Sequence, residues 1–185
     1  MNFRVLVGLS AVIAPFLHSL SDLIEWSQGG FSTGQLWLNY IAFLPMPWLL
    51  LGIYAVHNDP KPGLPALAGA LIYGAAFTYF SHTTLLALEQ HTATYEALWA
   101  GLGITYTVHG TLMVCGGLMF AFSALGTGWL PKGSLLFFVS GLSLNLVLAL
   151  LPLPDIFQIS GSALRNIGLI AMGYSILFRE SDAET

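Results

Sequence analysis

The run that decides the fold lies between residues 98 and 125. It reads LWAGLGITYTVHGTLMVCGGLMFAFSAL and contains no Asp, Glu, Lys or Arg. A helix needs about 20 mostly apolar residues to cross the hydrocarbon core of a bilayer, and this run exceeds that length. Other apolar runs fall at about 4–26, 36–57, 66–90, 134–151 and 159–178. The sequence therefore predicts an all-α, polytopic membrane protein, a single domain over residues 1–185 that forms a bundle of six transmembrane helices.

The composition excludes a soluble globule. Hydrophobic residues make up 56% of the chain and charged residues 8%, whereas a soluble domain carries about 25% charged residues. With so few charges, most of the surface must face lipid or other helices. The net charge is −4 and no basic stripe is present, so the expected partner is the lipid bilayer and not nucleic acid. The single cysteine, Cys115, excludes an intrachain disulfide and a cysteine-based zinc cluster.

The basic residues predict the orientation. Arg4, Lys61, Lys132 and Arg179 all fall on one side of a six-span topology, and the opposite loops contain no Lys or Arg. Cytoplasmic loops are enriched in these residues. Both termini are therefore expected to be cytoplasmic (N-in/C-in). The short loops of this compact chain favour the cytoplasmic (inner) membrane of a bacterium.

Ionisable and polar residues inside the spans gather in the half of the bilayer away from the cytoplasm. At 1.5 Å per residue, the groups at 18, 82, 109, 145 and 165 lie roughly 9–17 Å below the outer surface. The spacing i, i+4, i+7 places three polar groups on one face of the first helix, and similar faces occur on the third and fourth. Because unpaired charges avoid lipid, these faces predict an outward-opening pocket. Its expected lining is His18, Asp22, Glu25, Tyr79, His82, Glu89, Tyr106, His109, Asn145 and Arg165.

The polar residues and the glycines of the spans also have simpler, structural interpretations. Each histidine could be a hydrogen-bonded donor between helices, and Arg165 could form a structural ion pair with Asp22, Glu25 or Glu89. Glycines such as Gly69, Gly116 and Gly173 favour close helix packing, which in lipid depends on small residues.

The first functional hypothesis is a membrane-embedded enzyme that acts on a small or lipophilic substrate. Imidazoles titrate near neutrality and serve as general acids and bases, so the candidate catalytic residues are His82, His109 and Asp22. Alternatively, His18, His82 and His109 would bind a transition metal, or two of them a b-type haem with Arg165 near a propionate. The sequence contains neither a GxSxG nor an HExxH motif.

Two further hypotheses remain open. In length, number of spans and outward pocket, the chain is similar in outline to the substrate-capture subunits of ECF vitamin importers, a likeness carried by no sequence motif. That outline implies a subunit that binds or transports a small solute. The third hypothesis is a structural or accessory subunit, in which the polar groups only fix the register of the helices.

Overall fold

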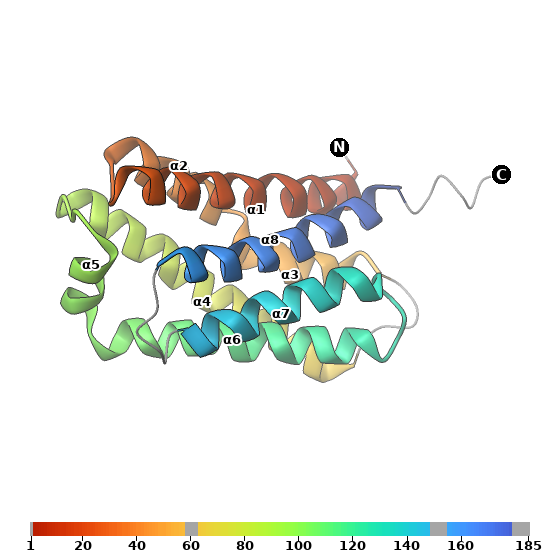
Figure 1. Ribbon diagram of the computed structural model, residues 1–185. Helices are drawn as coiled ribbons and strands as arrows, with labels where there is room; N and C mark the ends of the chain where they lie inside the picture. Colours follow the sequence, from red (N-terminus) through yellow and green to blue (C-terminus); the bar gives the residue numbers. More distant parts are fainter. Residues whose placement is uncertain (1, 58–62, 149–154, 179–185) are drawn as a thin grey trace.

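The chain is all-helical in the computed structural model, which describes residues 2–57, 63–148 and 155–178. Those ranges contain eight helices and no strand, so the predicted all-α class is confirmed. The helices are α1 (Phe3–Gln28), α2 (Thr33–Phe43), α3 (Met46–Ala55), α4 (Leu64–Glu89), α5 (Tyr95–Leu102), α6 (Ile104–Leu125), α7 (Lys132–Leu148) and α8 (Asp155–Phe178). The long ones run along a common axis (Figure 1).

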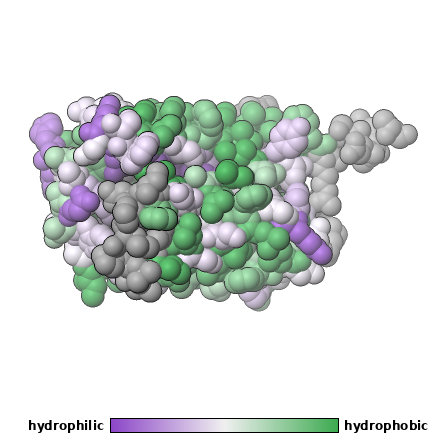
Figure 2. Space-filling view, in the orientation of Figure 1, coloured by the Kyte–Doolittle hydropathy of each residue, from purple (hydrophilic) through white to green (hydrophobic). Residues whose placement is uncertain are grey.

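Four elements are long and apolar enough to cross a membrane: α1, α2 together with α3, α4, and α6. The flanks of the bundle expose large hydrophobic side chains, among them Phe16 and Leu23 on α1 and Val108 and Phe122 on α6. Figure 2 shows that hydrophobic residues predominate along the length of the molecule, while most hydrophilic ones in this view lie toward the end that carries α5. Surfaces of this kind belong in lipid. The chain thus has the helices of an integral membrane protein.

The helices pack in a continuous series. Helix α1 lies against α2 and α8, α8 against α7, α7 against α6, α6 against α4, and α4 against α3. The core between them contains fully buried aromatic and aliphatic side chains such as Tyr73, Phe77, Phe120 and Phe138. The first and the last of the described helices, α1 and α8, therefore lie against each other.

Glycines set the closest helix contacts, as the sequence predicts. A Cβ atom added to Gly69 on α4 would lie 2.6 Å from the carbonyl oxygen of Gly116 on α6. One added to Gly173 on α8 would lie 2.8 Å from the carbonyl oxygen of Gly8 on α1. Real Cβ atoms do not approach backbone atoms so closely, so these helices meet backbone to backbone.

Two predicted spans are interrupted. The run 36–57 forms two helices because Pro45 and Pro47 cannot continue the hydrogen-bonding pattern of α2, so α2 ends at Phe43 and α3 begins at Met46. The run 98–125 begins inside α5 and breaks at Gly103, whose φ of 57° and ψ of −134° are not helical. The fourth long helix therefore starts at Ile104. The expected end of the fifth span, residues 149–151, lies outside the described residues.

The described ends of the chain lie at the same end of the bundle (Figure 1). The Arg4 Nε donates a hydrogen bond to the carbonyl oxygen of Ile176, at 2.9 Å, so the start of α1 is beside the last turn of α8. Helix α5 lies at the opposite end. Of the four basic residues that predict the orientation, Lys61 and Arg179 fall outside the described residues.

The close contact between α4 and α6 leads to a first prediction. We expect Gly69→Leu to lower the stability of the protein in detergent by about 1–3 kcal/mol, because the new side chain must push two backbones apart. Tryptophan fluorescence during thermal unfolding measures the change. The matched control is Gly110→Leu on α6, where an added Cβ meets nothing within 4 Å. Equal stabilities of the two variants would contradict the tight contact.

Candidate functional site

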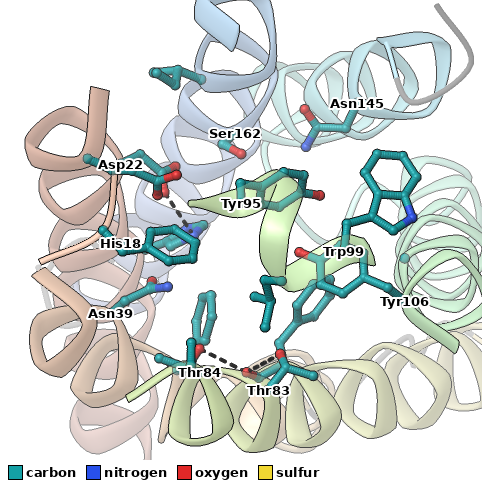
Figure 3. A pocket seen from close by; sticks show the side chains of 18 of the residues that line it. His18, Asp22, Asn39, Thr83, Thr84, Tyr95, Trp99, Tyr106, Asn145 and Ser162 are labelled. Atoms are coloured by element: carbon teal, nitrogen blue, oxygen red, sulfur yellow. Dashed lines mark hydrogen bonds and ion pairs between the residues drawn. The ribbon is translucent and has the colours of Figure 1, made fainter. Parts of the chain in front are cut away.

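A cavity of about 390 Å³ lies at the end of the bundle that carries α5. Its walls come from the second halves of α1 and α4, from α2 and α5, from the first halves of α6 and α8, and from the end of α7. Figure 3 shows polar side chains from several of these helices facing a common space. The cavity is in the half of the bundle opposite the described chain ends.

The structure brings six of the ten predicted pocket residues to this cavity. They are His18, Asp22, Glu25, Tyr106, Asn145 and Arg165. The lining does not include Tyr79, His82, Glu89 or His109. The six come from α1, α6, α7 and α8, so residues more than 140 positions apart in the sequence share one wall.

Arg165 occupies the deep side of the site and is only 3% exposed. One terminal nitrogen lies 3.0 Å from the Nδ1 atom of His18, and the other lies 3.4 Å from the sulfur of Met113. The Nε and one terminal nitrogen each lie 3.3 Å from the amide oxygen of Asn166. The guanidinium also stacks over the ring of Phe77, 5.7 Å from its centroid. These contacts occupy the guanidinium inside the protein, and His18 connects it to the carboxylate of Asp22.

The hydrogen bond from Arg165 fixes the tautomer of His18. An arginine only donates hydrogen bonds, so the Nδ1 atom of His18 accepts and the ring proton resides on Nε2. That Nε2 atom lies 3.4 Å from the Oδ1 atom of Asp22, one turn further along α1. Arg165, His18 and Asp22 thus form a polar chain from α8 into the cavity wall. Figure 3 shows His18 and Asp22 side by side there.

Asn166 was not among the predicted residues, although it completes this junction. Its amide nitrogen lies 3.1 Å from the Nδ1 atom of His18 and donates to the hydroxyl of Ser19 at 2.9 Å. Asn166 is fully buried. The available signal was its position directly after Arg165, because a buried guanidinium needs hydrogen-bond acceptors near it.

A second polar group of side chains lies between α1 and α2. Gln35, 2% exposed, donates from Nε2 to the hydroxyl of Ser21 at 2.9 Å and to Glu25 at 3.5 Å. Sequence reasoning placed Gln35 in a loop and missed it. The spacing Ser32-Thr-Gly-Gln35 was a signal, since it matches a helix N-terminus. The Ser32 hydroxyl does cap α2 by accepting a hydrogen bond from the backbone N–H of Gln35.

Aromatic side chains surround the outer part of the cavity. The rings of Tyr95 and Trp99 on α5 lie 6.0 Å apart, and each lies within 6.1 Å of the ring of Tyr106 on α6. Trp26 and Phe31 lie along the same part of the lining. Thr94 holds the start of α5 by accepting a hydrogen bond from the Ala97 amide. The short helix that interrupts the predicted fourth span therefore supplies part of this aromatic rim.

His109 lies in the wall between α4 and α6 and not in the cavity lining. It is 4% exposed, and its ring packs 4.2 Å from Phe80, 4.4 Å from Tyr79 and 4.5 Å from Tyr106. Its Nδ1 atom is 2.9 Å from the carbonyl oxygen of Thr105. His109 therefore has the surroundings of a packed core histidine.

His82 and Glu89 share a face of α4, but that face is exposed. The inward face carries Phe77 and, seven residues later, Thr84. His82 comes five residues after Phe77, which places it roughly 140° around the helix. Tyr79 is near this side, with its ring 6.3 Å from that of His82.

The histidine geometry gives the predicted metal and haem sites no support. In the described part of the chain, no group of three or more His, Cys, Asp or Glu side chains could hold a metal ion. His18, His82 and His109 lie respectively in the cavity wall, on the outer surface and between two helices. Both ring nitrogens of His18 already face Arg165 and Asp22. Of the predicted catalytic residues, only Asp22 lines the cavity.

No protein-family model, curated protein or solved structure matches this chain. The chemistry of the cavity follows from its own side chains. It combines carboxylates, amides and hydroxyls with aromatic rings and aliphatic walls. Concave sites with mostly apolar walls and a few placed polar groups are typical of small-molecule binding.

The junction between Arg165 and His18 leads to a second prediction. We expect His18→Leu and Arg165→Met to be coupled by about 0.5–3 kcal/mol in a double-mutant cycle, because each side chain satisfies the other. Chemical unfolding in detergent gives the four stabilities. His82→Leu is the matched control, since exposed His82 has no contact with Arg165, and its cycle with Arg165→Met should be additive. Additivity in both cycles would show that the hydrogen bond does not link the helices.

Proposed function

We propose that this protein crosses a bacterial inner membrane six times, with both termini in the cytoplasm, and binds a small, partly apolar molecule in the outer half of the bilayer. It would act as a binding or transport subunit. The observation that carries the proposal is the cavity of about 390 Å³ between the ends of the helices, with a polar side at His18, Asp22 and Arg165 and an aromatic rim.

The helix arrangement supports this topology. Taking α1, α2 with α3, α4, α6, α7 and α8 as the spans gives six crossings, and the described chain ends do lie at one end of the bundle. Arg4 and Lys132 are both at that end, at the starts of α1 and α7. Basic residues mark cytoplasmic ends. The cavity would then open toward the outside.

Binding or transport fits the site better than acid–base catalysis by histidine. General acids and bases must come within hydrogen-bond reach of the substrate. His109 is packed between helices, His82 faces outward, and His18 has both nitrogens occupied by Arg165 and Asp22. An accessory subunit whose polar groups only fix helix register needs no internal space, so the cavity also favours binding over that interpretation.

Thiol labelling tests both the cavity and its orientation. In a Cys115→Ala background, we expect Ser162→Cys, in the cavity lining, to react with a charged, membrane-impermeant maleimide added to intact cells. The reaction requires water at the thiol, which the cavity would supply. Labelling is measured by mass spectrometry or by a gel shift.

Two control variants complete the experiment. Ser140→Cys lies on an exposed flank of α7 within the proposed span and should stay unlabelled, because lipid surrounds it. Thr127→Cys, between α6 and α7, should react only after the membrane is opened from the cytoplasmic side. Protection of Ser162→Cys from outside, with reaction of Thr127→Cys in intact cells, would reverse the proposed orientation. Protection of Ser162→Cys from both sides would contradict a water-accessible cavity.

A further inference from the structure

The charge distribution around the cavity points to the class of ligand. We infer that the cavity binds an organic cation: an amine or quaternary ammonium group attached to an apolar body. The cationic group would lie by Asp22 and Glu25, with the apolar body against the aromatic rim. This inference rests on the proposed binding function and adds the chemistry of the ligand to it.

Acidic groups outnumber basic groups in the lining. Asp22, Glu25 and Glu96 line the cavity, and the described lining contains a single basic side chain, Arg165. Asp22 and Glu25 are three residues apart on α1, which puts them on neighbouring positions of one helix face. With all of these groups ionised and His18 neutral, the cavity carries a net negative charge, and a cationic ligand would reduce the repulsion between the carboxylates.

Arg165 is poorly placed to receive an anion. Its side chain is 3% exposed, and its nitrogens already contact His18, Asn166 and Met113. An anionic ligand would have to displace these partners, whereas a cation can approach Asp22, whose side chain is 17% exposed. The accessible charge of the site is therefore negative.

Unpartnered acceptor atoms lie on α2, and one of them belongs to a residue that lines the cavity. The amide oxygen of Gln35 is buried without a hydrogen-bond partner among the described residues, and so is that of Asn39, a lining residue. Gln35 is 2% exposed and is joined to Glu25 through its amide nitrogen. A buried acceptor without a donor costs free energy. Gln35 is not part of the lining, so a ligand that brings an N–H donor to Asn39 would recover part of that cost.

The aromatic rim suits a cation as well. Trp26, Tyr95, Trp99 and Tyr106 line the outer part of the cavity. The faces of such rings attract ammonium groups, and quaternary ammonium ligands are recognised in this way. Next to Tyr106, the buried side chains of Leu36 on α2, Ala87 on α4 and Leu98 on α5 form an apolar cluster that also lines the cavity. These side chains would receive the uncharged part of the ligand.

Three matched probes test the inference: phenylpropylamine, phenylpropanol and phenylpropanoate, which share an apolar body and differ in charge. Isothermal titration calorimetry of the full-length protein in detergent at neutral pH gives each affinity. We expect the amine to bind at least about tenfold more tightly than the alcohol, since only the amine can form a charge-assisted hydrogen bond with a carboxylate. The carboxylate should bind most weakly.

Carboxylate variants locate the effect. Glu25→Gln and Asp22→Asn should each reduce the preference for the amine over the alcohol toward one. The control is Glu89→Gln, which removes an exposed carboxylate on α4 outside the lining and should leave the preference unchanged. Glu25→Gln keeps the test valid if Asp22→Asn disturbs the contact of Asp22 with His18.

The outcomes separate the ligand class from the binding function. Equal or tighter binding of the alcohol or the carboxylate, or an equal loss in Glu89→Gln, overturns the cation inference and leaves the pocket in place. Absence of binding by all three probes also overturns it if Ser162→Cys is labelled. If that thiol is protected as well, the proposed function itself fails.

An amine in the cavity has two potential sources, a free molecule and a lipid headgroup. Repeating the titration in nanodiscs of phosphatidylglycerol, with and without phosphatidylethanolamine, distinguishes them. Equal affinity in the two bilayers identifies a free amine as the ligand. Weaker binding with phosphatidylethanolamine identifies the headgroup as the competing occupant. Both results support the same cation chemistry.

Discussion

Arg165 is the constraint around which the rest of this structure is arranged. A guanidinium inside an apolar bundle is costly unless it is paired and hydrogen-bonded, and this one is buried where α8 faces α1. Its acceptors come from three helices: His18 on α1, Met113 on α6 and the neighbouring Asn166 on α8. These contacts tie the first helix of the chain to the last, alongside the backbone contact between Gly8 and Gly173.

The same constraint shapes the cavity. Because His18 accepts from Arg165, its remaining nitrogen faces Asp22 and holds that carboxylate at the cavity wall. Glu25, further along α1, is joined to α2 by Gln35. Helix α5 then adds Tyr95 and Trp99 to the outer side, next to Tyr106. The carboxylate that balances the charge of Arg165, Asp22, therefore also lies in the cavity wall with Glu25. These two carboxylates are the basis of the proposed cation binding.

Much of this was predictable from the sequence, and the part that was not has a physical reason. Long apolar runs predict membrane helices because lipid tolerates little else, and charged groups such as Asp22 and Arg165 must turn inward. His82 was harder to place: both faces of a membrane helix are apolar, so hydropathy does not show which side of α4 faces inward. The break at Gly103 depends on local backbone angles that no run of apolar residues reveals. Asn166 and Gln35 have partners that only the fold brings close.

The tautomer of His18 tests the central claim most directly. Solid-state NMR of protein labelled with nitrogen-15 at histidine, in lipid, separates protonated from unprotonated ring nitrogens, and a His18→Leu sample identifies the His18 signals. The structure predicts a neutral ring with an unprotonated, hydrogen-bonded Nδ1 and a protonated Nε2. The Nδ1 signal should also move in Arg165→Met. A proton on Nδ1, or no response to Arg165→Met, would show that Arg165 does not organise the site.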